Sequence, residues 1–141
     1  MLTRLLIVGT FLLPTVGCGK ITDAQNRVKA SNDLKELALT YHKFVLTEGR
    51  PPKSYAELNQ KYPMTPECER ATVYWGADII AKDGSSGDTI LGHLPNPGGK
   101  GVLAMYCDGS VRAITQAEFD AAKKAQPLAD KKTDAIKEAK W

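Results

Sequence analysis

Cysteine is the residue type best suited to covalent chemistry in this chain of 141 residues, and three are present: Cys18, Cys68 and Cys107. Because three cysteines cannot all pair, at least one has another role. A disulfide between Cys68 and Cys107 would close a loop of about 40 residues and stabilise the fold by roughly 4 kcal/mol in the chain-entropy model. The alternative is two buried free thiols, because a small apolar side chain suits hairpin packing at Cys107. We predict the disulfide and keep the alternative open.

The histidines and their neighbours do not favour an enzyme active site. Cys107, His93 and Asp108 are residue types that could serve as nucleophile, base and orienting group. A turn already explains Asp108, however, and no feature of the sequence brings His93 to Cys107. His42 has no histidine or cysteine three or four residues further along, where a second metal ligand on a helix would stand. We therefore predict a protein that is not an enzyme and that uses no metal or cofactor.

Two glycine-containing loops match ligand-binding loops only in part. Asp83 and Asp88 flank a glycine-rich turn, and carboxylate oxygens on such a turn suit calcium. The EF-hand spacing and its distal glutamate are absent, so a solvated turn is the preferred interpretation of residues 83–88. Residues 98–101 (Gly-Gly-Lys-Gly) lack the spacing of a phosphate-binding loop and precede a predicted strand rather than a helix. Asp83 and Asp88 remain the calcium candidate of this chain.

The first 17 residues have the composition of an export signal. A basic start precedes residues 5–13, an apolar stretch shorter than the roughly 20 residues of a membrane-spanning helix. Residues 15–18 (Thr-Val-Gly-Cys) resemble the lipobox of bacterial lipoproteins, in which the cysteine carries the lipid and begins the mature chain. The resemblance implies a signal peptide over residues 1–17 and a lipid on Cys18; the alternative is an ordinary cleaved signal. Export would also favour the disulfide, because disulfides persist in oxidising compartments.

The elements that must position these residues follow from the pattern of apolar side chains. Residues 21–47 contain no glycine or proline and repeat apolar residues every three or four positions, which predicts a long helix ended at Gly49. Capping boxes that begin at Ser54 and Thr115 predict two short helices, the second running to about residue 126. Runs rich in β-branched and aromatic residues predict strands over residues 72–80, 89–93, 102–107 and 110–114.

The last two predicted strands are joined by Asp108 and Gly109, which predict a hairpin turn of type I′ with positive φ at both residues. The expected fold is therefore α+β, with a long N-terminal helix packed on a small antiparallel sheet of three to four strands and a short C-terminal helix. We expect this domain to span residues 18–126, and residues 127–141 to form a charged tail.

The composition agrees with a single globular domain. The chain is 43% hydrophobic and 25% charged, which is typical of a folded domain rather than a disordered chain. Its 19 basic and 16 acidic residues give a net charge of +3. Nucleic-acid-binding proteins usually concentrate a larger basic excess on one face. We therefore expect no nucleic-acid partner.

Two segments carry a pattern that occurs together in one family. The first is residues 31–39 (Ser-Asn-Asp-Leu-Lys-Glu-Leu-Ala-Leu), followed by His42, Phe44, Gly49 and a Pro-Pro pair. The second is residues 97–101 (Pro-Gly-Gly-Lys-Gly), a strand, and then residues 108–112 (Asp-Gly-Ser-Val-Arg). Together they resemble prepilin-like proteins of the G-type pseudopilin class of type II secretion. The resemblance implies an N-terminal helix packed on a small antiparallel sheet.

The chain departs from that family at its N-terminus. It lacks the prepilin cleavage site and the long apolar helix that packs the filament core, and has a short signal and Cys18 instead. It also has Asn96-Pro97 where the family often has a histidine before the glycine pair. We therefore expect the fold of a pseudopilin head without filament assembly.

These observations predict a non-catalytic, lipid-anchored protein of the bacterial cell envelope that faces the periplasm or the cell exterior. Its pseudopilin-like head would have a structural or protein-interaction role. Its partners would be the membrane, through the lipid on Cys18, and other envelope proteins. The alternative is a minor pseudopilin subunit of a type II secretion or pilus-like machine, against which the missing prepilin motif argues.

Overall fold

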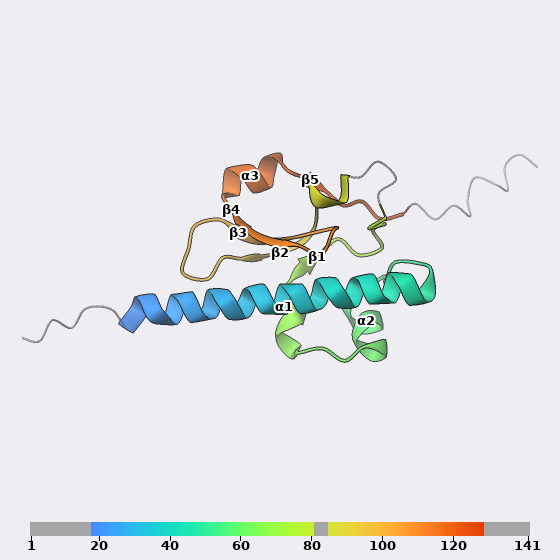
Figure 1. The fold of residues 1–141 in the computed structure, drawn as a ribbon, viewed down its shortest axis with the longest axis horizontal. Helices are drawn as coiled ribbons and strands as arrows, with labels where there is room; N and C mark the ends of the chain where they lie inside the picture. The colour runs from blue at the N-terminus through green and yellow to red at the C-terminus, as the bar shows by residue number, and fades with distance from the viewer. Residues whose placement is uncertain (1–17, 81–84, 129–141) are drawn as a thin grey trace, which may run out of the picture.

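One long helix runs along the molecule and carries the sheet on one side (Figure 1). The structure, a computed structural model, describes the backbone of residues 18–80 and 85–128, with side chains from residues 21–80 and 86–128. Helix α1 (Cys18–Glu48) has 31 residues, which corresponds to a length of about 46 Å at 1.5 Å per residue. It confirms the predicted long helix, and Gly49, with φ of 66°, follows its last residue.

The main core lies between one face of α1 and the sheet. The apolar side chains of this face are buried, and they are Leu34, Leu37, Ala38, Tyr41, Phe44 and Val45. They pack with buried residues of the sheet such as Leu91, Leu103 and Met105. The Tyr41 hydroxyl donates to the Ala77 carbonyl oxygen at 2.8 Å, so the polar atom of this buried side chain has a partner. The predicted packing of helix on sheet is confirmed.

The sheet is formed by β1 (Thr72–Val73), β2 (Thr89–Pro95), β3 (Val102–Tyr106), β4 (Val111–Ile114) and β5 (Lys123–Lys124). The first four strands are antiparallel neighbours in the order β1-β2-β3-β4, which confirms the predicted antiparallel sheet. β5 is an addition to the prediction and pairs in parallel with the beginning of β2. The fold is therefore α+β with an antiparallel sheet of four strands and one short parallel strand.

Two predicted elements are shorter than expected. The strand predicted over residues 72–80 has only two residues in the sheet, because the Gly76 N–H donates to the Pro52 carbonyl oxygen at 2.9 Å and turns the chain toward α2. Helix α3 (Gln116–Ala121) ends before residue 126, because the residues after it join the sheet. There the Ala125 N–H donates to the Ile90 carbonyl oxygen at 2.8 Å.

A second, smaller core covers the face of the sheet opposite α1. Ile90, Ala104 and Tyr106 are buried there and pack against Phe119 and Ala122. The predicted capping box at the start of helix α3 is confirmed. β3 is therefore buried on both faces, with α1 on one side and α3 on the other.

The β3–β4 hairpin turns at Asp108 and Gly109, as predicted, but its turn is not of type I′. A type I′ turn needs a positive φ at both central residues. Gly109 has a φ of 86°, but Asp108 does not have a positive φ, since among the described residues only glycines do. The Gly109 N–H donates to the Tyr106 carbonyl oxygen at 2.9 Å, and the Tyr106 N–H donates to that of Ser110 at 2.9 Å. This is a three-residue loop with a glycine bulge. Asp108 suits it because its carboxylate accepts the Ser110 N–H at 2.8 Å.

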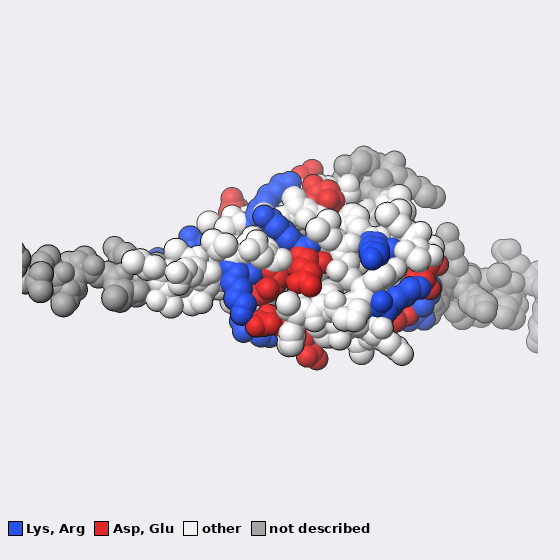
Figure 2. Space-filling model, turned by 60° about the horizontal axis from the view of Figure 1, so that its bottom comes forward, with Lys and Arg blue, Asp and Glu red and all other residues white. Residues whose placement is uncertain are grey.

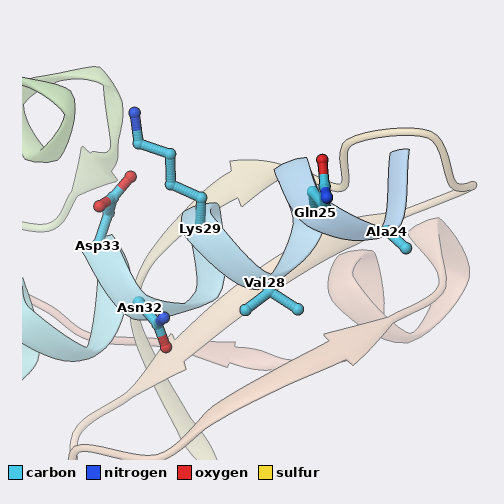
Figure 3. A pocket seen from close by; sticks show the side chains of 6 residues that line it. All are labelled: Ala24, Gln25, Val28, Lys29, Asn32 and Asp33. Atoms are coloured by element: carbon cyan, nitrogen blue, oxygen red, sulfur yellow. The ribbon is translucent and has the colours of Figure 1, made fainter. Parts of the chain in front are cut away.

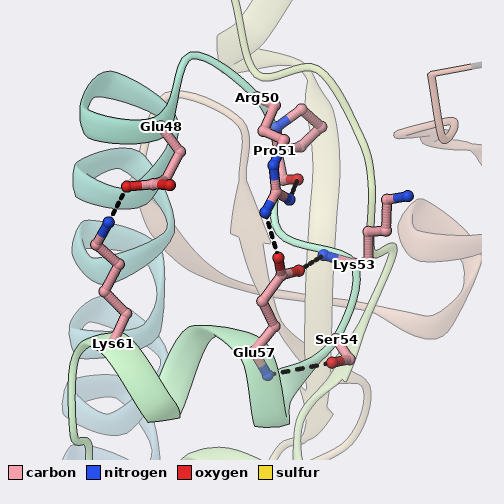
Figure 4. A network of polar contacts seen from close by, with 7 residues as sticks. All are labelled: Glu48, Arg50, Pro51, Lys53, Ser54, Glu57 and Lys61. Carbon is pink, nitrogen blue, oxygen red and sulfur yellow. Dashed lines mark hydrogen bonds and ion pairs between the residues drawn. The ribbon is translucent and has the colours of Figure 1, made fainter.

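Polar contacts hold the connection between α1 and α2 (Tyr55–Lys61) (Figure 4). The Glu57 carboxylate accepts from the Arg50 guanidinium at 2.5 Å and from the Lys53 N–H at 2.6 Å. Its own N–H donates to the Ser54 hydroxyl at 3.2 Å, which confirms one half of the predicted capping box; the Glu57 carboxylate accepts from Lys53 rather than from the Ser54 N–H. Because the charged groups are partly exposed to solvent, they fix the path of the chain more than they add to stability.

Candidate functional site

The N-terminal part of α1 projects beyond the sheet (Figure 1). Cys18 is the first residue of α1, and every residue from Ile21 to Lys29, the projecting stretch, is exposed. The first core side chain of the helix is Ala30. The predicted signal peptide, residues 1–17, lies outside the described residues. Of the helices in the described ranges, none is long and apolar enough to span a membrane.

A shallow hollow of about 590 Å³ lies on the projecting stretch itself (Figure 3). Its lining comes from α1 alone and consists of Ala24, Gln25, Val28, Lys29, Asn32 and Asp33. Figure 3 shows Lys29 and Asp33 pointing to one side of the helix, and Val28 and Asn32 pointing to the other. Because a single helix lines this hollow, it offers no second wall to hold a ligand.

A more polar hollow of about 310 Å³ lies between α1, the short 3-10 helix η1 (Pro66–Arg70) and the β2–β3 connection. Lys29 and Arg70 bring two cations to it, and Asp33 and Glu67 bring two carboxylates. Lys29 donates to Glu67 at 2.8 Å, and burial raises the pKa of the Asp33 carboxyl. Figure 2 likewise shows basic and acidic side chains next to one another over the face that it presents. Charges of both signs balance, so this hollow selects neither an anion nor a cation.

The β2–β3 connection, residues 96–101, packs directly against the projecting stretch. A Cβ atom on Gly98 would overlap the side chain of Asp23, with its Oδ2 at 2.8 Å. A Cβ atom on Gly99 would meet the Asn96 side chain first, with its Nδ2 at 2.5 Å, and the Arg27 guanidinium at 3.3 Å. Close approach to α1 therefore explains glycine at position 98. The connection therefore packs on the projecting stretch of α1.

Cys68 and Cys107 are both buried and are free thiols in the structure, so the predicted bridge between them is not formed there. The Cys68 sulfur lies 3.4 Å from the Asp33 carbonyl oxygen, whereas Cys107 is two residues before Gly109, which lies beside His42. Asp33 and His42 are nine residues apart on α1, a rise of about 14 Å. A disulfide needs Cβ atoms within about 4.5 Å of each other. The two cysteines therefore lie beside different parts of α1, and the disulfide between them stays a prediction.

Thiol counting tests this arrangement on a Cys18→Ser variant isolated without reductant. We expect two thiols to react with Ellman's reagent after denaturation, and neither to react quickly in the folded protein. The folded thiols should be slow because burial raises the pKa of Cys68, and raises that of Cys107 to about 11. No reactive thiol after denaturation would show instead that Cys68 and Cys107 are bridged.

His93 and Cys107 lie on opposite faces of the sheet. Cys107 belongs to the core beneath α1. The His93 ring lies on the α3 side, with its centroid 4.5 Å from that of Phe119 and 6.4 Å from that of Tyr74. Asp108 is engaged in its turn. The structure therefore does not assemble the nucleophile, base and orienting group that the residue types alone would allow.

His93 gives the protein a predicted sensitivity to acid. Burial, and then the nearby Lys124 ammonium, lower the pKa of His93 below its ordinary value of 6.5. The unfolded state therefore binds more protons than the folded state near pH 6.5, so the free energy of unfolding should fall as the pH is lowered through this range. We expect the decrease to disappear in His93→Leu and to persist in His42→Gln, which changes the other histidine. Urea unfolding at pH 7.5 and pH 5 measures this; an equal decrease in His93→Leu would contradict it.

His42 and the predicted calcium loop complete the candidate residues. α1 places His42 beside the β3–β4 hairpin, where its Nε2 atom would lie 3.7 Å from a Cβ atom on Gly109. Asp88 is exposed after the short 3-10 helix η2 (Ser85–Gly87), whereas Asp83 lies outside the described residues. Within residues 18–80 and 85–128, no three histidine, cysteine or acidic side chains gather where a metal ion could be held.

Sequence reasoning missed a hollow of about 330 Å³ on the other side of α1, against β3 and β4. Arg27, Ser31 and Lys35 line it from the helix, and Ala113 lines it from β4. Spacing of four residues could have placed the three helical residues on one side of α1. The strand that faces them depends on the sheet register, for which the sequence carries no local signal.

Comparison of the chain with models of protein families, with curated proteins and with solved structures gives no match. What the protein does must therefore follow from its own residues and their arrangement.

Proposed function

We propose that the protein is a non-catalytic, lipid-anchored protein of the bacterial cell envelope, whose pseudopilin-like head acts through contacts with other proteins. The head is the described part from residue 30 onward. The observation that carries the proposal is the position of Cys18, which is both the residue marked by the lipobox-like sequence and the first residue of α1. A rigid helix therefore leads directly from the proposed anchor into the core of the head.

The projecting stretch would act as a spacer between membrane and head. From Cys18 to Asp23, where the β2–β3 connection of the head first packs on the helix, α1 rises about 8 Å at 1.5 Å per residue. The described side chains from Ile21 to Lys29 are exposed, so the head would lie close to the membrane surface but outside it when the cysteine is anchored. A single acyl chain holds a protein only weakly, and two or more chains on one cysteine hold it stably. The proposed place of the head is the periplasm or the cell exterior.

A minor pseudopilin is the second candidate, and one feature of the fold supports it. A long helix packed on an antiparallel sheet, followed by a hairpin at Asp108 and Gly109, agrees with what the family resemblance implies. The missing prepilin site in the sequence argues against it. Co-purification of the protein with a pilus-like fibre would favour this second candidate over the first.

Labelled palmitate tests the anchor in cells that express the full chain. We expect the protein to incorporate the label and to fractionate with membranes, and the Cys18→Ser variant to lose both properties. Cys68→Ser is the matched control, because it also removes one thiol but should keep the label. An unlabelled protein that is cleaved at another residue would overturn the lipid anchor.

A further inference from the structure

β4 is an edge strand with one unpaired side. Within the described part of the chain it pairs with β3 alone. The Tyr106 N–H donates to the Ser110 carbonyl oxygen at 2.9 Å, which makes these two residues a hydrogen-bonded pair. Hydrogen-bonded and non-hydrogen-bonded pairs alternate along an antiparallel ladder. The register then turns the N–H and C=O groups of Val111 and Ala113 away from β3, toward the open edge.

A groove runs beside this edge, between β4 and α1. We call it the β4 groove; it is the hollow of about 330 Å³ described above. Val111 and Ala113 pair with Met105 and Leu103, which belong to the core beneath α1, so their side chains lie on the same face of the sheet. Ala113 is exposed and small, and it leaves space between β4 and the helix. A strand added to β4 would therefore direct alternate side chains into the groove.

The β4 groove carries positive charge. Arg27 and Lys35 line it, and none of its described lining residues is acidic. Arg112 lies on the other face of β4, with its guanidinium 4.5 Å from the Tyr106 ring and 3.9 Å from the Asp108 carboxylate, so it does not contribute to the groove. The β4 groove differs from the hollow on the other side of α1, where Asp33 and Glu67 balance the cations.

We propose that β4 and the β4 groove bind an extended, acidic segment of a partner protein, which adds to the sheet as a further strand. Main-chain hydrogen bonds to Val111 and Ala113 would supply affinity, and the cations beside the edge would select acidic side chains. Pairing of β4 with β4 of a second copy is disfavoured, because it would bring the cations of both copies together. The proposal specifies the partner contact of the proposed function and does not depend on the lipid anchor.

Peptide binding to the Cys18→Ser protein tests the proposal. The probes are three fluorescent heptapeptides of equal length: one alternates valine and glutamate, one alternates valine and lysine, and one is the acidic peptide with a central proline. We expect only the first to bind and its affinity to fall with added salt. In ¹⁵N spectra, binding should shift the amide signals of Val111 and Ala113, because these groups would form the new hydrogen bonds.

Three variants separate the contributions of backbone and charge. Ala113→Pro removes an outward N–H from an edge strand, where proline is tolerated, and should weaken binding at least about tenfold. Lys35→Glu should weaken binding by about five- to tenfold, whereas Lys53→Glu, the same change of charge far from the groove, should alter it less than about twofold. Circular dichroism confirms that each variant is folded.

Several outcomes would overturn the proposal. These are no binding of the acidic peptide up to about 1 mM, equal binding of the three peptides, or self-association of the protein through β4. Loss of palmitate labelling together with intact peptide binding would refute the anchor alone. Intact labelling without peptide binding would refute the β4 site alone.

Discussion

Replacing Gly101 with alanine is expected to lower the free energy of unfolding by about 3–5 kcal/mol, which would make it among the most damaging single changes in the chain. Gly101 has φ of 87°, a conformation in which a Cβ atom alone costs about 1–2 kcal/mol. The new Cβ atom would also overlap the carbonyl oxygen of Ile114 and lie 3.0 Å from the Thr115 Cα atom. Both neighbours are backbone atoms, so no side-chain rotation can relieve the overlap.

The surroundings of Gly101 explain why the backbone cannot easily move. Its carbonyl oxygen accepts the Asn96 N–H at 3.2 Å, which closes the β2–β3 connection. The next residue, Val102, pairs with Ile114 in the ladder between β3 and β4. Thr115 caps α3. Moving Gly101 away from Ile114 would therefore disturb the connection, the ladder and the cap together.

Gly49→Ala is the matched control for this prediction. Gly49 also has a positive φ, of 66°, but a Cβ atom there would meet no other atom within 4 Å. Its replacement should therefore show the conformational cost alone, about 1–2 kcal/mol. Urea unfolding followed by circular dichroism measures both variants. Equal losses of stability in the two would contradict the overlap with Ile114.

Patterns within one element predicted the helical part of the fold well. The run without glycine or proline predicted α1, and the capping boxes at Ser54 and Thr115 predicted where α2 and α3 begin. These signals act over three or four residues, so the sequence contains them in full. The packing of α1 on the sheet also followed, because its apolar stripe needs a partner and the sheet offers the apolar face.

Errors arose where a distant segment decides the local structure. Tyr74 and Trp75 have the composition of a strand, but Trp75 stacks on Tyr41 of α1, with ring centroids 6.1 Å apart, and leaves the sheet. Lys123 and Lys124 were expected in a helix but pair with the beginning of β2. Each case depends on contacts between residues far apart in the sequence.

The candidate site also has one part that neighbouring residues reveal and another part that depends on distant contacts. Cys18 could be proposed as a lipid attachment site from four consecutive residues, because such a signal is local. The β4 groove could not, because it needs the register that places Ala113 at an open edge and the rotation of α1 that brings Lys35 beside it. The spacing of residues along α1 places its cations on one side of the helix, but the sequence does not show which strand that side faces.

Leu37→Ala is expected to lower the free energy of unfolding by about 2–5 kcal/mol, whereas Leu39→Ala should change it by less than about 0.5 kcal/mol. Leu37 is fully buried at the centre of the core between α1 and the sheet, so its loss removes apolar burial and leaves a cavity. Leu39 is 68% exposed on the same helix.

The two substitutions form a matched pair, because each replaces leucine by alanine in the interior of α1 and changes helix propensity equally. Any difference between them therefore reports burial alone. Urea unfolding of both variants measures it. Similar losses of stability would mean that α1 does not present this face to the sheet, and the β4 groove, which depends on the same rotation of the helix, would then be misplaced as well. A large difference would confirm the rotation of α1 on which the β4 groove depends, with Arg27 and Lys35 on the side of the helix that lies along β4.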